Sequence, residues 1–452
     1  MKKRADASTE AVDTLIRLLK GKADSYEIFY SADTGFGAES VGMAVDALKA
    51  RSSAGVGLRV VSGGRQGFGL SSVLTKDALS DVAGKAVAGS AESSQDEYLV
   101  FAAPGKAAAE PTSLEVFDED FYSGTEEQKI SCAIRIEQAA RALSPKIARV
   151  RKASYNESIS TVRIVNSNGV DVSSSATYFS GSVTAVAEEG AESQMGWEIG
   201  MGHKRSGIDP EAIGRGAAQN ALRMLGGRNI ATVRCPAVIE NTVACELLES
   251  LAGSFSAENV HKGKSMLAGK AGKKVVSSAL NIIDDGLLRS GWASSPYDGE
   301  GTPSQTKRLI KDGVLAAYLY DTYWARRDGA ASTGNAVRSS YKSLPGLGIS
   351  NLYIEKGAKP QDELLREMGR GLFITEVMGV HTINTVSGDF SIGASGLWVE
   401  GGVAAYPVRG MAIAGNLLEL FSKVAACGSN LRFIGSIGAP DILVSELEAS
   451  GA

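Results

Sequence analysis

The chain has 452 residues, of which 44% are hydrophobic and 22% are charged; this is the composition of an ordinary globular protein and excludes extensive disorder. The length predicts two or three domains. The formal net charge of −4 at pH 7 excludes a general electrostatic attraction to nucleic acid. We expect a cytoplasmic protein, because no apolar run is long enough to span a membrane and no apolar segment follows the basic residues at the N-terminus.

Histidine and cysteine, the usual ligands of zinc, are scarce. The chain has 4 cysteines and 3 histidines, and both sets are scattered. An HExxH motif, which places two imidazoles one helical turn apart with a glutamate beside them, is therefore absent. No closely spaced pair of cysteines indicates a zinc knuckle or a disulfide framework. The residues are Cys132, Cys235, Cys245, Cys427, His203, His261 and His381.

The first half begins with a helix and a set of glycine-punctuated strands. A stripe of apolar residues predicts a helix over Ser8–Lys20, and Ser25–Ser31 is typical of a strand. We expect residues 33–74 to form successive strands of an antiparallel meander, with a hairpin turn at Gly63-Gly64. A second helix is predicted at Thr75–Ser90.

Two further helices and a second hairpin follow in this half. Thr125 and Gln128 have the spacing of a capping box at the start of a helix. The turn at Asn166–Gly169 indicates a hairpin between two long strands. Asp209-Pro210 is typical of a helix start, with the aspartate as N-cap, and we expect that helix to end at Gly226-Gly227.

The second half is predicted to consist mostly of strands and turns. We expect a helix over Thr242–Phe255, strand-like runs such as Lys274–Ile283, and a last helix that opens at Asn416 and closes at Gly428. Strands and helices are mixed without regular β–α alternation. We therefore predict an α+β fold with two domains, residues 1–228 and 229–452, each with mostly antiparallel sheet and flanking helices.

One predicted helix carries residues that weakly resemble a metal site. The pairs Cys245-Glu246 and Glu249-Ser250 lie within Thr242–Phe255, where Cys245, Glu249 and Ser250 share a face by their spacing. A thiol without imidazole partners makes a poor zinc site. The alternative interpretation, a partly buried cysteine beside surface glutamates, needs no metal.

Charged residues gather again further along the chain. Asp284-Asp285 and the Asp298-Gly299-Glu300 run place carboxylates in a short stretch, which suits a hard cation or acid–base chemistry. Solvent-exposed turn carboxylates are the commoner explanation of such a run. Arg326 and Arg327, beside Trp324, suit recognition of a carboxylate or a structural ion pair with one of these acids.

Long stretches in the correct order are similar to the TldD/PmbA family. The similarity covers nearly the whole chain, and it implies a two-domain α+β fold. The matching stretches are GVGLRVVSGGRQGFG (Gly55–Gly69), VNSNGV (Val165–Val170), IIDDGLLRSGWASSPYDGEGTPSQTKRLIKDGVLAAYLYDTYWARR (Ile282–Arg327), STGNA (Ser332–Ala336), GRGLFITEVMG (Gly369–Gly379), VSGDFSIGASGLWVEGG (Val386–Gly402) and YPVRGMAIAGNLLEL (Tyr406–Leu420).

The resemblance implies a subunit of a cytoplasmic metallopeptidase. In this family the TldD type carries HExxxH on a helix and a later cysteine, which hold the metal, and the glutamate is the general base. The PmbA type, also called TldE, lacks these groups and pairs with TldD. Here Cys245-Glu246 and Ser250 stand where the helix motif is expected, and Ile437 stands near the position of the cysteine. The chain therefore resembles the PmbA type, with no metal of its own and zinc in the TldD-type partner.

Several functions follow from the resemblance as expectations. The expected partners are a TldD-type subunit and small or unfolded peptides, and a homodimer is expected when the chain is alone. The expected processes are proteolysis, peptide-antibiotic maturation or antitoxin degradation. We hypothesise a peptide or partner surface that includes Asp298, Glu300, Arg326, Asn335 and Asp389; the alternative is that these groups hold turns together. Two other functions stay open, a peptidase active through an unrecognised site and a regulator that contacts DNA gyrase directly. Neither nucleic acid nor membrane is an expected partner.

Overall fold

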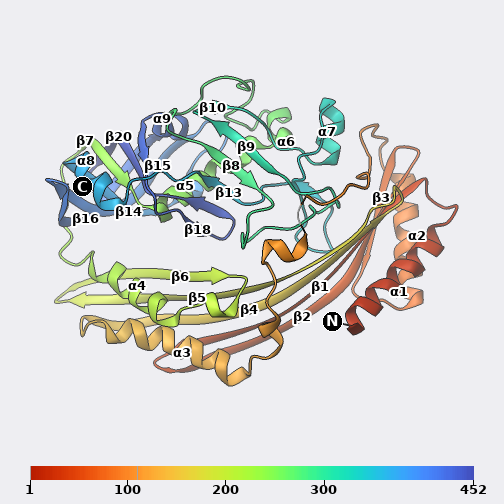
Figure 1. The fold of residues 1–452 in the computed structure, drawn as a ribbon, viewed down its shortest axis with the longest axis horizontal. Helices are drawn as coiled ribbons and strands as arrows, with labels where there is room; N and C mark the ends of the chain where they lie inside the picture. The colour runs from red at the N-terminus through yellow and green to blue at the C-terminus, as the bar shows by residue number, and fades with distance from the viewer. Residues whose placement is uncertain (1, 109, 452) are drawn as a thin grey trace.

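The computed structural model describes residues 2–108 and 110–451 and consists of two halves packed on each other (Figure 1). The first half is built on a six-stranded antiparallel sheet in the order β3-β2-β1-β4-β5-β6. Its long strands curve beneath the second half (Figure 1). The strands are β1 (Ser25–Val41), β2 (Ala44–Ser62), β3 (Arg65–Ser71), β4 (Ile147–Asn166), β5 (Asp171–Glu189) and β6 (Glu192–Gly202).

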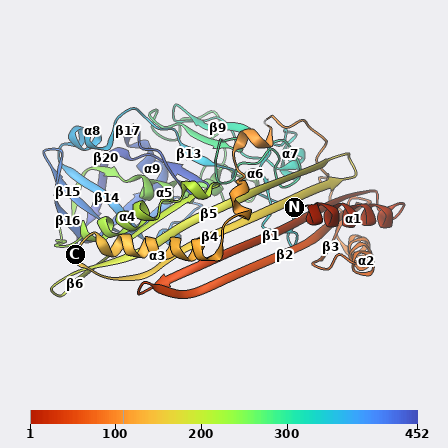
Figure 2. The same ribbon diagram turned by 60° about the horizontal axis from the view of Figure 1, so that its bottom comes forward.

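Four helices cover one face of this sheet (Figure 2). Side chains alternate between the two faces of a strand, and Ile28, Tyr30 and Ala38 of β1 point to the helices and are buried there. Phe29 points to the other face and packs against Tyr341 of the second half. The sheet therefore lies between these helices and the second half of the chain. The helices are α1 (Lys2–Leu19) and α2 (Lys76–Glu92) at one end, and α3 (Glu126–Ala142) and α4 (Pro210–Leu222) at the other.

The two capped helix starts predicted for this half are confirmed, whereas the first helix begins at Lys2 and not at Ser8. Thr125 accepts a hydrogen bond from the backbone N–H of Gln128, and the Gln128 side chain accepts one from the backbone N–H of Thr125, which completes the capping box. Asp209 caps α4 through a 3.0 Å hydrogen bond from the backbone N–H of Ala212. These contacts fix the starts of α3 and α4, and the other end of α4 lies at the junction with the second half.

The second half contains two larger sheets. One has the order β16-β15-β14-β7-β20-β17, and β16 also pairs with β20, so its strands close upon themselves. The other has the order β10-β9-β8-β13-β19-β18, and β11 (Ala336–Val337) pairs with β12 (Gly346–Leu347). The strands of the two larger sheets are β7 (Val233–Ile239), β8 (Ile282–Asp285), β9 (Thr306–Lys311), β10 (Val314–Leu315), β13 (Leu352–Ile354), β14 (Gly371–Met378), β15 (Asp389–Glu400), β16 (Val403–Asn416), β17 (Val424–Cys427), β18 (Arg432–Ile434), β19 (Ile437–Ala439) and β20 (Ile442–Ser450).

Helix α5 (Asn241–Ala252) lies in the core of the second half. It packs against β14 of one sheet and against β18 and β19 of the other. Its buried side chains include Val243, Leu247 and Leu251, none more than 1% exposed, so the helix is held on several sides. The remaining short helices are α6 (Ala257–His261), α7 (Thr322–Asp328), α8 (Gln361–Met368) and α9 (Leu417–Ser422), with 3₁₀ turns at Pro111–Leu114, Glu119–Tyr122, Arg205–Gly207, Gly253–Phe255 and Val380–Thr382.

The α+β class is as predicted, and the sheets are antiparallel except for the pairs β7–β14 and β13–β19. The predicted last helix is too long, because α9 ends at Ser422 and the apolar residues after it form β17, which pairs with β20. Lys274–Ile283 is strand only at its last two residues, since the core also buries Val276 and Leu280 in irregular chain. In both places tertiary packing overrides the local pattern.

The predicted boundary at residue 228 falls between α4, which ends at Leu222, and β7, which begins at Val233. No helix among residues 2–108 and 110–451 is long and apolar enough to cross a membrane.

A buried ion network joins the two halves. Arg59 of β2 donates hydrogen bonds to Glu27 of β1 (3.1 Å) and to Glu300 of the second half (3.0 Å). Arg338, also from the second half, pairs with the other oxygen of Glu27. Burial alone raises the pKa of Glu27, but the charges of Arg338 and Arg59 outweigh it and hold this pKa below its usual value. Glu27 is therefore ionised, and each guanidinium ties one half to the other.

Removal of Arg59 should strongly destabilise the fold. In an Arg59→Met variant the buried Glu27 loses one of its two cations and Glu300 loses its own, which typically costs about 3–5 kcal/mol of unfolding free energy. The measurement is urea unfolding of both proteins. Lys85→Met, which breaks the exposed pair between Lys85 and Asp81, is the control and should cost less than about 1 kcal/mol. Equal effects of the two substitutions would contradict the role of the network.

Candidate functional site

Four positions were predicted for a degenerate metal site, and the structure brings Cys245 and Ile437 of these four together. Cys245 of α5 is buried, and its Sγ lies 3.6 Å from the carbonyl oxygen of Ile437 and 3.6 Å from that of Arg432. Glu246 follows on α5 and lines a cavity. Ser250 lies one turn later, and its hydroxyl donates to the carbonyl oxygen of Glu246 at 3.1 Å, within the helix.

These four positions do not offer a set of metal donors. Burial raises the pKa of Cys245 to about 12, so its thiol keeps its proton at neutral pH, whereas a metal ligand must be the thiolate. Ile437 presents only a backbone carbonyl, and Ser250 is engaged in its own helix. Throughout the described part of the chain, no three His, Cys, Asp or Glu residues are grouped so that they could hold a metal ion. The residues present therefore do not fit a catalytic zinc ion.

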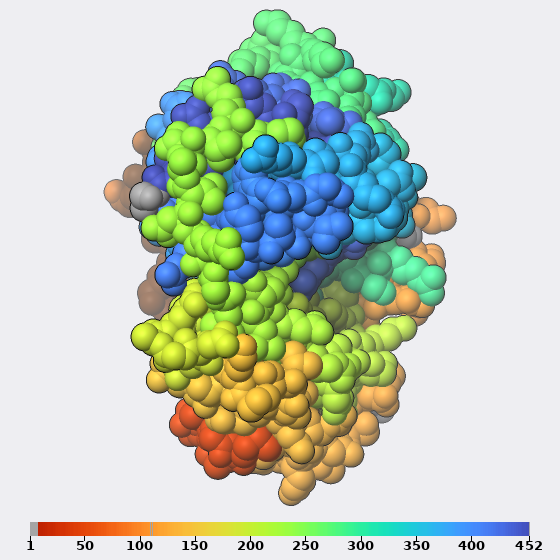
Figure 3. Space-filling model, turned by 90° about the vertical axis from the view of Figure 1, so that its left-hand side faces the viewer, coloured from red at the N-terminus to blue at the C-terminus, as the bar shows by residue number. Residues whose placement is uncertain are grey.

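The cavity beside Glu246 lies at the junction of the two halves and has a volume of about 390 Å³. Figure 3 shows the surface hollowed where the yellow-green segments of the first half meet the blue segments of the second. Strand β6 and helix α4 line the cavity from one side, and α5, β14 and β18 line it from the other. The charged residues around it are Glu198, Arg223, Glu240, Glu246, Glu376 and Arg432.

Two ion pairs span this junction. Arg223, at the end of α4, binds the carboxylate of Glu240 with two hydrogen bonds of 2.8 and 2.9 Å, just before α5 begins. Arg432 of β18 pairs with Glu198 of β6 and also donates to the carbonyl oxygen of Ile199. Both guanidinium groups are therefore engaged by carboxylates, and they hold the two sides of the cavity together.

Glu246 and Glu376 lack such partners. Neither carboxylate has a hydrogen bond or an ion pair to any other residue that the structure describes. Burial is the main cause that raises the pKa of each; for Glu246 the nearby charges of Glu249 and Glu376 add to it, and for Glu376 the charge of Arg223 opposes it. Neither carboxylate is therefore bound by a cation of this chain, but their settings differ, because Glu246 is half-buried and the side chain of Glu376 is exposed to solvent.

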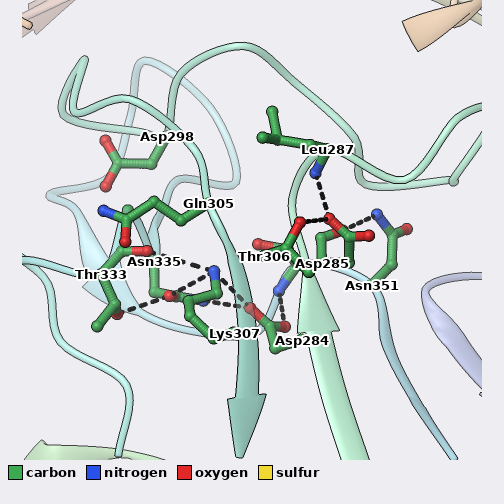
Figure 4. Close-up of polar contacts among 12 residues, drawn as sticks. Asp284, Asp285, Leu287, Asp298, Gln305, Thr306, Lys307, Thr333, Asn335 and Asn351 are labelled. Atoms are coloured by element: carbon green, nitrogen blue, oxygen red, sulfur yellow. Dashed lines mark hydrogen bonds and ion pairs between the residues drawn. The ribbon is translucent and has the colours of Figure 1, made fainter. Parts of the chain in front are cut away.

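Two of the five residues predicted for a peptide or partner surface hold loops in place. Asn335 is buried and links a second network, in which it donates to Asp284 at 2.9 Å and accepts from Lys307 at 3.0 Å, while Lys307 pairs with Asp284 at 2.8 Å (Figure 4). Asp298 lies apart from these contacts (Figure 4) and accepts hydrogen bonds from three backbone N–H groups, including that of Ala336 at 3.0 Å. Burial, and next the charge of neighbouring Glu300, raise the pKa of Asp298 to about 7.

The other three residues lie in different settings. Glu300 is 1% exposed and belongs to the network that joins the halves, so it is not a surface group within this chain. Asp389 is exposed, but Asn416 and Ser387 donate to it and hold its pKa below the usual value, as expected of a turn carboxylate. Arg326 is exposed on α7. The structure does not bring the five together, and their contact with a peptide or partner stays a prediction.

Sequence reasoning missed most of the charged groups around the cavity. Glu198, Arg223, Glu240 and Arg432 come from four separate segments, and no local pattern connects them. Glu376 had a usable signal, because it is the single charged residue of the mostly apolar strand GLFITEVM. A charged residue in such a strand marks the side that is not packed in the core.

Comparison with known proteins gives consistent matches over most of the chain. Three models of the PmbA/TldA metallopeptidase match, namely domain 1 over residues 26–90, the central domain over residues 119–225 and the C-terminal domain over residues 232–451. The chain is 29% identical to the metalloprotease PmbA of Escherichia coli O157:H7 over 446 residues, which is 98% of this chain and 96% of that protein.

Solved structures have the same fold. A crystal structure from Thermotoga maritima, whose name refers to modulation of a DNA gyrase, is 29% identical, covers 98% of this chain and 100% of its own, and superposes with a TM-score of 0.90. TldE from Thermococcus kodakarensis covers 98% of this chain and 100% of its own with a TM-score of 0.89; at 22% identity it shows the fold alone.

Asp321 should make the stability of the protein depend on pH. It caps α7 through a 2.8 Å hydrogen bond from the backbone N–H of Trp324, and burial raises its pKa from 3.8 to about 6. Between these values the folded state keeps a proton that the unfolded state releases, so stability falls as the pH rises from about 4 to about 6. Asp321→Asn keeps a good N-cap and should remove this decline, which amounts to at most about 3 kcal/mol.

The check on Asp321 is denaturant unfolding of both proteins at several pH values. Asp362→Asn, which changes an exposed aspartate of α8, is the control. If the wild-type protein and Asp321→Asn lose stability in parallel over this range, the assignment to Asp321 is wrong.

Proposed function

The chain belongs to the PmbA/TldD metallopeptidase family, and from this premise we propose that it is a non-catalytic subunit of a metallopeptidase complex, of the PmbA (TldE) type. Its partner would be a TldD-type subunit that carries the zinc ion and performs the cleavage, in the cytoplasm. Its substrates would be small or unfolded peptides.

One observation carries this proposal. The Sγ of Cys245 is enclosed by the carbonyl oxygens of Ile437 and Arg432, so the place where a TldD-type subunit is expected to hold its metal is filled by protein packing. Glu246 keeps the carboxylate expected of a general base, but without a metal-bound water it has nothing to activate. The scaffold around it is complete, which is expected of a chain retained for binding and assembly.

The chain's own groups would contribute shape and charge. The two ion pairs that span the junction, Arg223 with Glu240 and Arg432 with Glu198, would keep the cavity open at a fixed width. A peptide held there would be oriented by the walls of the cavity rather than cleaved. The alternative of a regulator of DNA gyrase rests on the name of one similar structure, and the net charge of −4 argues against a regulator that acts by contacting DNA.

The proposal predicts that zinc binding and cleavage belong to the partner and not to this chain, and co-expression can test this. The chain alone should contain substoichiometric zinc by elemental analysis and should not cleave a fluorogenic unfolded peptide. When a TldD-type relative from the same genome is co-expressed, the two should co-purify, the zinc should be found in the relative, and cleavage should appear.

A Cys245→Ser variant separates the proposal from a peptidase that uses its own thiol. Serine can still donate to the carbonyl oxygen of Ile437, so the complex should keep its activity. Loss of cleavage in a variant that still binds its partner, or stoichiometric zinc in the chain alone, would show instead that this chain carries a catalytic centre.

A further inference from the structure

The hairpin of β1 and β2 ends in a tip that is both apolar and exposed. Residues 41–51 read VGMAVDALKAR, and all of them are exposed except the half-buried Ala47. Antiparallel strands usually bury one of their two faces, so a run of exposed apolar residues indicates a surface that another chain covers. The large apolar side chains of this tip, each 39–45% exposed, are Val41, Met43, Val45 and Leu48.

The outer edge of β2 is unpaired at the tip. Strand β3 pairs with β2 only from Val56 to Ser62, and no other strand that the structure describes lies along the outer edge of residues 44–51. Figure 2 shows β2 as the lowermost strand of the sheet, with no neighbour outside this part of it. The backbone N–H and C=O groups of such an edge are a template for a further strand. The tip therefore offers hydrogen-bonding groups as well as apolar side chains.

The tip is held in a fixed position by α3. The buried carboxylate of Glu137 accepts hydrogen bonds from Ser40 Oγ at 2.7 Å and from the backbone N–H of Met43 at 3.0 Å. Arg141 donates to the other oxygen of Glu137 at 2.8 Å. A surface that is fixed before association loses little conformational entropy when it binds. The hairpin tip is therefore preorganised for contact with another chain.

The charges of the tip are complementary to themselves. Asp46 and Arg51 have opposite charges, and neither has an ion pair or a hydrogen bond with another residue in the described part of the chain; Lys49 is held by Glu39 at 2.7 Å. A two-fold contact brings the same surface of two copies together in opposite directions. When it is centred on Leu48, each Leu48 meets the other, and Asp46 of each copy comes level with Lys49 and Arg51 of the second copy.

We propose that the hairpin tip is the contact surface of a homodimer, in which the β2 strands of two copies pair antiparallel around Leu48. The two six-stranded sheets then form one continuous sheet. The inference goes beyond the proposed function and does not depend on it, because it concerns the contact of this chain with a second copy and not with a TldD-type subunit. A copy carries the complementary charges on its own β2, whereas a peptide of arbitrary sequence does not.

The test is sedimentation velocity of the full chain over a series of concentrations. The wild type should be a dimer at micromolar concentration. Leu48→Glu should weaken the dimer by roughly tenfold or more, because it places two carboxylates against each other at the two-fold axis. Val403→Glu is the matched control, since Val403 is 68% exposed near a hairpin turn of the second half, and this variant should dimerise like the wild type. Circular dichroism should show the same fold for both variants, because both positions are exposed.

A charge exchange tests the direction of pairing. Asp46→Arg and Arg51→Asp should each weaken the dimer, because each places like charges at the same level of the two strands. The double variant restores opposite charges and should recover most of the wild-type affinity. Hydrogen exchange of the backbone amides of residues 47–50 should be slower in the wild-type dimer than in Leu48→Glu.

Three results would overturn the inference: a wild-type chain that stays monomeric at every concentration, equal dimer affinities of Leu48→Glu and Val403→Glu, or a double variant that dimerises no better than the single variants. Co-purification with a TldD-type relative separates the other possible occupant. If the chain alone is monomeric and Leu48→Glu no longer binds that relative, a second copy is the wrong occupant and the tip belongs to the contact with the TldD-type subunit.

Discussion

Buried charge pairing between the two halves is the constraint on which the arrangement depends. Arg59 lies between Glu27 of its own half and Glu300 of the other, and Arg338 completes the set from the opposite side. Buried charges are tolerated only when they are paired in good geometry, so the halves have little freedom to slide over one another. The cavity at the other end of the junction, near α4 and α5, takes its form from this fixed relation.

The two ends of the junction use charge in different ways. At the Arg59 end each carboxylate is matched by a cation, and the result is rigidity. At the cavity the pairs Arg223–Glu240 and Arg432–Glu198 provide the same fixing, but Glu246 and Glu376 are left over. Perturbed carboxylates in a cleft between domains are typical of a binding site. The structure thus separates the charged groups that join the two halves from two carboxylates that no described residue binds.

The region around Cys245 supports the proposal of a subunit that keeps its family's scaffold without the catalytic chemistry. The thiol is packed between two backbone carbonyls, its pKa is raised by burial, and Ile437 stands beside it. Such an interior contributes stability through packing rather than reactivity. It also leaves α5 in position, so that Glu246 still reaches the cavity from its exposed side.

The sequence by itself determined the family, the α+β class, and the positions of the capped helices and hairpins, because these depend on residues that are close together along the chain. Thr125 with Gln128 and the Asn166–Gly169 turn are examples of such local chemistry. Only the tertiary structure decided that residues after Ser422 form a strand, that Glu300 is an interior ion-pair partner, and that Glu246 and Glu376 line one cavity. The reason is that burial, strand pairing and charge neutralisation depend on segments far apart in sequence, and no local pattern records which of them meet.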